Sequence, residues 1–470
     1  MTREAALKAV LNMRRCLNIN PILLGREMMK EHNVSTKIVF AVLLGMTSMF
    51  FSSCAITLRE SNNTLTIPNY ETENKNSESN DEAADKDNVI EETEFVPTEP
   101  EETEEIAETT ETAAETEAAD PYENVDISFI ATGDNLIHPN IYIDAYDRGN
   151  DEKRYDFLTM YSDVADYIAS ADIAFINQET VMAGEEYGYS GYPCFNAPRQ
   201  LGLDMVTLGF DIVNIANNHM LDMGASGLES TIEFWNEQSV LLLGGYLNEE
   251  DASNIRTLEK DGVKMAFLSY TLSTNGIVKN ASSEVVIPYI DDAQILSDME
   301  KAREICDILI VSIHWGDENT QTPNSEQIRL SKLISNAGAD VILGHHSHTL
   351  QPIEWIERDD GGRTLCIYSL GNFVSGMARP VNQVGGFLSF HIRSDGNGSL
   401  EIAEPSFTPT VFYYGMDWYN THVYFLEDYT DEIASTHGVQ ISGYYLSVSD
   451  ARAYVTNVIE NEFLPDWLKQ

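Results

Sequence analysis

Polar side chains follow five apolar stretches of the chain, each at the point where a predicted strand ends. Strands are expected over residues 125–132, 172–177, 212–216, 308–313 and 341–343. The polar residues after them are, in chain order, Asp134; Glu179; Asn217, Asn218 and His219; His314 and Glu318; and His345, His346 and His348. Oxygen and imidazole donors in this mixture suit Mn, Fe or Zn. Such a set could hold metal ions that activate a water molecule.

The elements that must position these residues alternate along the chain. Amphipathic periodicity predicts helices over residues 155–170, 198–208, 226–238, 292–305 and 325–336. Continuous apolar strands between such helices favour a mainly parallel sheet. Strands without helices between them, over 353–357, 364–369, 386–392 and 399–403, predict a second, partly antiparallel sheet. We therefore expect an α/β fold, a four-layer α/β/β/α sandwich, with a final helix at 449–462.

In an open α/β sheet, ligands bind beyond the carboxyl ends of the strands. The five polar groups should therefore meet at one sheet edge, although more than 200 residues separate the first from the last. A single histidine at a strand end is more often structural. Polar groups after five successive strands together predict a site.

The first 54 residues have the order of an export signal. Lys30 and Lys37 precede an uncharged apolar run at 38–51, and Ser52-Ser53-Cys54 follows it. A basic segment, a short apolar run and small residues are typical of a secretory signal. The run is shorter than the about 20 residues that cross a bilayer. Cys54 after two serines resembles a bacterial lipobox, so Cys54 is the expected lipidation site. Ordinary cleavage and an uncleaved anchor are the alternatives.

Residues 55–124 are expected to be a disordered linker. They are rich in Glu and Thr and poor in apolar residues, so they cannot bury enough surface to offset their chain entropy. The predicted organisation is a signal or lipoprotein segment at 1–54, this linker, the folded α/β domain at 125–410 and a C-terminal extension with a helix at 411–470.

The charge balance limits the partners. Lys and Arg number 28 against 76 Asp and Glu, a formal net charge of −48. This excludes a nucleic-acid partner, which needs a basic face. An anionic substrate would need metal ions or a few well-placed basic residues. The five cysteines are too sparse for a disulfide framework.

At these residues the sequence resembles a known family. It is similar to the CapA, or poly-γ-glutamate capsule-synthesis, family, which has a calcineurin-like metallophosphoesterase fold. The matching pieces run in family order across about 130–375: Gly133-Asp134, Asn177-Gln178-Glu179, Asn217-Asn218-His219 with Asp222, His314-Trp315-Gly316 with Glu318, Gly344-His345-His346-Ser347-His348, and Tyr368-Ser369-Leu370-Gly371-Asn372-Phe373.

The resemblance implies a site with one or two divalent transition-metal ions. Its implied ligands are Asp134, Glu179, Asn218, His314, His346 and His348. His219 would polarise a leaving group or bound oxyanion, and Glu318 is assigned with it to catalysis. Substrate contacts are assigned to His138, Asn177, His345, Asn372 and Arg379. Arg379 is a rare basic residue that could clamp a carboxylate or phosphate.

The chain departs from the pattern at two places. Gln178 stands where the family usually has Leu. The ordinary phosphoesterase pattern begins Asp-x-His, whereas Asn135 and Leu136 follow Asp134 here. One ligand of a two-metal site is thus missing or replaced. His138 is the nearest histidine and the candidate replacement.

Three functions are compatible with these observations. The first is a metal-dependent hydrolase of a phosphoester or an amide, held on the outer face of a bacterial cell membrane and acting in capsule or poly-γ-glutamate metabolism. The second is a non-catalytic accessory protein that binds or guides an anionic polymer during export. The third is a cell-wall adhesion module with a relic site. The expected partners are the membrane, an anionic polymer such as poly-γ-glutamate, and membrane synthase subunits.

Overall fold

The computed structural model describes residues 121–469. The predicted signal segment, Cys54 and nearly all of the predicted linker lie outside these residues. The described chain begins with a turn at 121–124, where the Tyr122 hydroxyl donates to Asp307 Oδ1 at 2.9 Å. Between residues 121 and 469, no helix is both long enough and apolar enough to cross a membrane.

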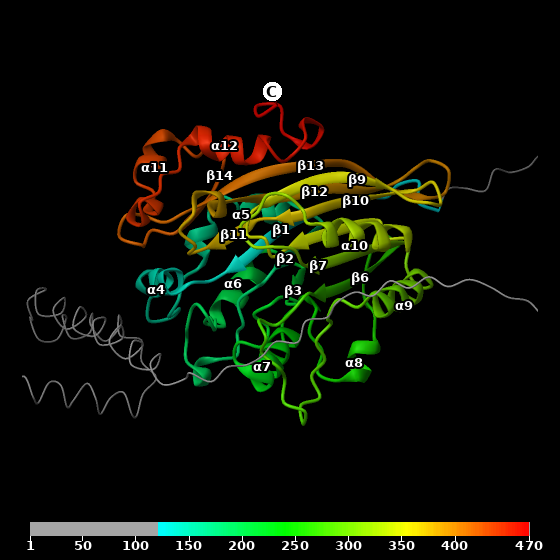
Figure 1. Cartoon of the computed structure of the whole chain (residues 1–470), viewed down its shortest axis with the longest axis horizontal. Helices are drawn as coiled ribbons and strands as arrows, with labels where there is room; N and C mark the ends of the chain where they lie inside the picture. The colour runs from blue at the N-terminus through cyan, green and yellow to red at the C-terminus, as the bar shows by residue number, and fades with distance from the viewer. Residues whose placement is uncertain (1–120, 470) are drawn as a thin grey trace, which may run out of the picture. The chain divides into compact units, whose positions relative to one another are not determined.

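Two β-sheets form the centre of this part of the chain (Figure 1). The first has the order β14-β13-β12-β1-β2-β3-β4, with β11 paired to β1. Its strands are β1 (Asp126–Leu136), β2 (Ile173–Asn177), β3 (Ile212–Asn214), β4 (Leu241–Leu243), β11 (Asn372–Ser375), β12 (Val384–Ser394), β13 (Leu400–Tyr413) and β14 (His422–Phe425). The strands β1 to β4 are parallel neighbours, and β12 to β14 extend the sheet antiparallel.

The second sheet has the order β5-β6-β7-β8-β10-β9. Its strands are β5 (Arg256–Lys260), β6 (Val263–Thr271), β7 (Ile308–His314), β8 (Val341–His345), β9 (Leu350–Glu357) and β10 (Arg363–Leu370). The inner strands are parallel, and β5 and β9 pair antiparallel at the two edges.

Helices cover the two sheets. The first sheet carries α5 (Ala165–Ser170), α6 (Gln200–Leu208) and α7 (Gly224–Asn236), and the second carries α9 (Asp292–Arg303) and α10 (Ser325–Asn336). Local sequence begins the last two: the Asp291 side chain caps α9, and Asn324 forms a capping box with Gln327 at α10. The predicted α/β fold with two sheets and outer helices is confirmed.

Alternating side chains of β6 show why the layers stack. Met265 and Phe267 face the core between the two sheets. Leu268 and Tyr270 belong to a second cluster, together with Met299 of α9. Successive strand residues point to opposite faces, so a strand covered on both sides is apolar throughout. The continuous apolar runs at 308–313 and 341–343 predict buried strands for the same reason.

Some elements differ from those predicted. The expected helix at 155–170 is a 3-10 turn, Leu158–Tyr161, followed by the short α5. The helices α4 (Pro139–Arg148), α8 (Glu249–Ser253) and α11 (Asp431–Ser435) were not predicted. The final helix, α12 (Val448–Thr456), ends earlier than expected. The residues after 410 add β14 to the first sheet, and α12 packs beside β12.

Candidate metal centre

The polar residues after the strands converge where the parallel strands end. Asp134 and Asn177 sit side by side in the register of β1 and β2. His314 and His345 are register partners at the ends of β7 and β8. The two sheets face each other, so both rows of strand ends reach one region. Folding thus brings together residues far apart in the sequence.

The Glu179 carboxylate lies at the centre of this region. Its Oε1 atom is 3.7 to 3.9 Å from the Nε2 atoms of His348 (3.7 Å), His314 (3.8 Å) and His219 (3.9 Å). These distances are too long for hydrogen bonds. Two ligands bound to one ion at about 2.0–2.2 Å lie about 3–4 Å apart, so the spacing fits shared coordination.

Buried polar atoms without partners support the same interpretation. Glu179 is fully buried, and neither of its carboxylate oxygens has a hydrogen-bond partner within residues 121–469. His314 Nδ1 and His346 Nδ1 are likewise buried without a hydrogen-bond partner among these residues. Buried polar groups are otherwise almost always hydrogen-bonded. The donor set therefore fits a divalent transition metal.

Asp134 occupies the end of β1 beside His348. Its Oδ1 accepts a hydrogen bond of 2.7 Å from Asn177 Nδ2, and its Oδ2 lies 3.1 Å from His348 Nδ1. Ligand atoms of Asp134, Glu179 and His348 all lie within 4.8 Å of one another. Asp134 is thus held in place through one oxygen, while the other faces the group.

A ladder of amides holds Asp134. Asn214 Nδ2 donates to Asn177 Oδ1 at 2.8 Å, and the Ser269 hydroxyl donates to Asn214 Oδ1 at 2.5 Å. Asp134, Asn177 and Asn214 are register partners on β1, β2 and β3, and Ser269 comes from β6 of the second sheet. Every donor points towards the carboxylate, so the bonds polarise one another and favour its ionised form. The ladder ties the position of Asp134 to both sheets.

Asn218 and His314 form a second pair of candidate ligands. The Asn218 Oδ1 atom lies 2.9 Å from His314 Nε2, and its Nδ2 donates to Asn275 Oδ1 at 3.2 Å. That second bond orients the amide so that its oxygen faces the site. Asn275 lies in the loop after β6, which the sequence reasoning did not connect to the site.

His219 is oriented by Asp222. The His219 Nδ1 atom lies 2.8 Å from Asp222 Oδ2, which also accepts the Phe195 backbone N–H at 2.6 Å. A carboxylate at Nδ1 holds the proton on that nitrogen and leaves Nε2 towards Glu179. The Phe195 ring packs edge-on against the imidazole at 4.8 Å. This His–Asp pair suits proton transfer at Nε2.

The two departures from the family pattern form one buried polar pair. Asn135 Nδ2 donates to Gln178 Oε1 at 2.8 Å, and Tyr161 donates to Asn135 Oδ1 at 2.8 Å. Gln178 Nε2 donates in turn to the Asn135 backbone oxygen. Both polar ends of the Asn135 side chain are therefore taken up by hydrogen bonds to Gln178 and Tyr161. The next residue, Leu136, is buried and has no side-chain atom that could bind a metal.

His138 does not join either of the metal-compatible groups found within residues 121–469. Its Nδ1 accepts the backbone N–H of Gly376 at 3.0 Å, and its ring packs edge-on against Phe195 at 5.0 Å. Burial lowers the pKa of His138 to about 4, so the ring is neutral at pH 7. It belongs to the wall of the site.

The other predicted substrate contacts divide into two kinds. Asn177, His345 and Asn372 are fully buried beneath the site. The His345 ring stacks on Phe175, and Asn372 Oδ1 lies 2.9 Å from His348 Nδ1. Asn177 and Asn372 thus hold the candidate ligands Asp134 and His348, whereas neither ring nitrogen of His345 has a hydrogen-bond partner among the described residues. Arg379, in contrast, is exposed at the start of the 3-10 turn Pro380–Gln383.

The electrostatics of the site favour a cation. Burial raises the pKa of Glu179 well above its usual value, and the charge of Asp134 adds to this, although His348 opposes it. Burial lowers the pKa of His346 to about 4 and that of His314 well below its usual value. These two imidazoles are neutral at pH 7, which is the form that binds metals. Burial opposes a charge on His348 too, but Glu179 and Asp134 raise its pKa to about 10.

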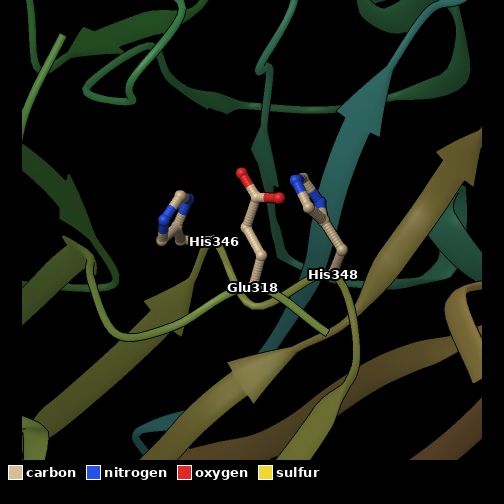
Figure 2. A group of neighbouring side chains, drawn as sticks. All are labelled: Glu318, His346 and His348. Carbon is tan, nitrogen blue, oxygen red and sulfur yellow. The ribbon is translucent and has the colours of Figure 1, made fainter. Parts of the chain in front are cut away.

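A second group lies towards solvent. Glu318, His346 and His348 also offer ligand atoms within 4.8 Å of one another, and Figure 2 shows the Glu318 carboxylate between the two imidazoles. Glu318 and His346 are the more exposed members, and His348 is shared with the buried group.

The site residues missed by the sequence reasoning are Asn214, Ser269 and Asn275. Asn214 carried a sequence signal, because it is a polar residue within the apolar strand expected at 212–216.

The fold and site are those of an α/β protein with candidate metal ligands at the strand ends. Residues 128–377 match the family described as bacterial capsule synthesis protein PGA_cap. The match covers more than half of the chain, so this protein belongs to that family.

Two curated relatives carry related descriptions. The PGA biosynthesis protein CapA of Bacillus subtilis is 32% identical over 197 residues, which cover 42% of this chain and 50% of the relative. The capsule biosynthesis protein CapA of Bacillus anthracis is 31% identical over 199 residues, 41% of this chain and 47% of the relative. The chain thus spans about half the length of these curated relatives.

Solved structures give weaker likenesses. A 5'-nucleotidase precursor from Thermus thermophilus is 16% identical with a TM-score of 0.37, covering 59% of this chain and 54% of its own. The calcineurin-like phosphoesterase YfkN of Bacillus subtilis is 14% identical with a TM-score of 0.37, covering 68% and 95%. TM-scores below 0.5 carry nothing about the chemistry of this chain.

Proposed function

We propose that this protein is a metal-dependent hydrolase acting on an anionic polymer of the capsule, such as poly-γ-glutamate. The observation that carries the proposal is the buried Glu179 carboxylate. It has three imidazole Nε2 atoms around one oxygen and no hydrogen-bond partner among residues 121–469. A divalent transition metal bound there would activate a water molecule and offset the charge of the substrate. The names of the curated relatives support capsule polymer as the setting.

His219 is the general acid of this proposal. Asp222 holds the proton of Nδ1, so Nε2 is the atom that takes up a proton from the attacking water and passes it to a leaving oxygen or nitrogen. Phe195 packs against the ring and limits its rotation. His219 can therefore act on the leaving group while other residues hold the metal.

Arg379 is proposed as a contact for the anionic substrate. The turn that it begins packs on the site, because Asn382 Nδ2 donates to the His348 backbone oxygen at 2.9 Å. The Arg379 side chain is exposed and has no ion pair with any carboxylate of residues 121–469. A guanidinium in this position is suited to a carboxylate or phosphate.

A second candidate function is supported by Leu136. It replaces the histidine of the ordinary Asp-x-His pattern, and no other donor from that strand takes its place. A centre with weakened metal binding would suit an accessory protein that binds or guides the polymer without cleaving it.

One experiment separates the two functions. The purified full chain is assayed for bound Mn, Fe and Zn, and for hydrolysis of poly-γ-glutamate and of a phosphodiester. We expect at least one bound ion and turnover of one substrate that stops on chelation. Polymer binding without turnover would favour the accessory function. A protein with neither metal nor turnover would contradict the hydrolase.

We further propose that the protein is anchored outside the cell membrane through a lipid on Cys54, where membrane synthase subunits are its partners. The basic residues, apolar run and Ser52-Ser53-Cys54 order support this. The wild type should incorporate a fatty-acid label in cells, and a Cys54→Ala variant should not. Equal labelling of both would contradict the anchor.

A further inference from the structure

We propose that Glu318 is a metal ligand, which holds a divalent transition cation together with His346 and His348 on the solvent side of Glu179. This inference rests on the proposed function, because both depend on a metal centre at this sheet edge. It assigns Glu318 to coordination, whereas the sequence reasoning assigned it to catalysis. It also supplies the donor that Leu136 cannot provide.

The Glu318 side chain points towards the two histidines. Its carboxylate extends between the imidazoles of His346 and His348, with ligand atoms of all three within 4.8 Å of one another (Figure 2). No hydrogen bond or ion pair joins this carboxylate to another side chain of residues 121–469. A carboxylate aimed at two imidazoles has the donor arrangement of a metal ligand.

His348 also has the surroundings of a metal ligand. Its Nδ1 lies 2.9 Å from Asn372 Oδ1 and 3.1 Å from Asp134 Oδ2. Since both neighbours are acceptors, they favour the proton on Nδ1, which leaves the lone pair of Nε2 for a metal. Metal-bound histidines usually donate their other nitrogen to a carboxylate or carbonyl in this way.

Hydrogen bonds hold the loop that carries Glu318 against the segment with the histidines. The Asn319 backbone N–H donates to the Ser347 oxygen at 2.7 Å. The Thr320 oxygen accepts from Thr349 Oγ1 at 2.7 Å and from Gln351 Nε2 at 3.0 Å. These bonds join the residues after Glu318 to the segment that carries both histidines. The three ligands therefore share one rigid support.

The backbone is also strained at the group. Asn319, His346 and His348 have φ values of 61°, 91° and 56°, in the left-handed region that residues with a Cβ atom rarely adopt. Such strain persists where surrounding structure enforces it, and it clusters at functional sites.

Two ions can be held when His348, which belongs to both groups, serves the outer ion. Glu179, Asn218 and His314 form the buried set, since Asn218 Oδ1 and Glu179 Oε1 lie 2.9 and 3.8 Å from His314 Nε2. Glu318, His346 and His348 form the outer set. An outer ion with three protein ligands keeps positions open for a substrate oxygen. This would let an acidic protein bind an anionic polymer.

The test counts bound metal. Wild type, Glu318→Gln, Asp317→Asn and Glu179→Gln proteins are loaded with Mn²⁺ or Zn²⁺, dialysed and analysed for metal, and their affinities are measured by calorimetry. Asp317 is the control, because it is exposed in the same loop and its Oδ2 accepts from Asn324. Melting in chelator checks that each variant folds.

We expect Glu318→Gln to lose one equivalent of metal, or to bind it at least about 10- to 100-fold more weakly, the loss seen when even an outer partner of a ligand is removed. Asp317→Asn should keep the wild-type number, and Glu179→Gln should lose the buried ion and retain the outer one. Wild-type binding by Glu318→Gln would overturn the assignment of Glu318 alone. A wild type without metal would overturn the metal centre and the proposed hydrolase together.

Discussion

In a Glu179→Gln variant we expect hydrolysis to disappear and the metal-free protein to become more stable than wild type. The wild-type carboxylate is fully buried, and neither oxygen has a hydrogen-bond partner within the described chain. Leaving a buried polar group unsatisfied costs about 1–3 kcal/mol, and more when the group is charged. A neutral amide of the same shape removes the charge and can donate to a nearby imidazole nitrogen.

The measurement is unfolding by denaturant in chelator and again with Mn²⁺, with metal content and turnover determined on the same samples. The free energy of unfolding in chelator should rise by about 1–3 kcal/mol. The stabilisation by metal should shrink, because a cation stabilises the fold only in proportion to its binding. Glu357→Gln, at the exposed end of β9, is the matched control and should change none of these quantities.

A metal-free Glu179→Gln protein less stable than wild type would contradict this interpretation. It would mean that the carboxylate has a stabilising role of its own in the folded protein. Full turnover by the variant would contradict the hydrolase mechanism, whatever its stability.

A His219→Asn variant should lose turnover by about 10²- to 10⁴-fold, the usual contribution of a general acid. Its metal content should stay at the wild-type level. The reason is geometric: the Asp222 carboxylate orients His219 through Nδ1, so the imidazole serves proton transfer at Nε2. The turnover rate should fall less for substrates with a nitrophenolate leaving group, which departs without a proton. It should fall more for substrates with an alkoxide or amine leaving group.

The control for this variant is His422→Asn. His422 also has a carboxylate neighbour, with Nε2 at 2.6 Å from Asp163 Oδ2, but it lies on β14 at the edge of the first sheet. It should retain wild-type turnover. If the His219→Asn variant loses a metal ion, His219 is a metal ligand and not the general acid. The geometry allows this outcome, because the Nε2 atoms of His219 and His314 lie 3.9 and 3.8 Å from Glu179 Oε1. An equal loss on both classes of substrate would exclude the general acid.

The sequence alone indicated the order of strands and helices and the edge at which the site lies. Apolar runs such as 308–313 predict buried strands, because a strand covered on both faces is apolar at every position. The polar residue at the end of each run can be read locally. The convergence of Asp134, Glu179 and His314 then follows from the rule that parallel strands end at one edge. The family motifs could be read for the same reason, since each is a short local segment.

Only the tertiary structure decided what each polar side chain contacts. His345 and His348 are three residues apart, yet one lies against Phe175 between the sheets and the other reaches Glu179. Asn135 turns towards Gln178, 43 residues away, and so takes no part in the site. Neither outcome is contained in a local pattern, because the direction of a side chain depends on strands that meet it only after folding.

The pairing of whole segments also could not be predicted from local sequence patterns. The residues after 410 contribute β14, which pairs with β13 at the edge of the first sheet, and no local pattern indicated this pairing. The aim of Glu318 depends on bonds between its loop and residues 347–351, and the amide ladder depends on Ser269 from the facing sheet. Sequence periodicity predicts which residues are buried and where strands end. The contacts of a site are set by packing between distant segments, and these become neighbours only in the folded chain.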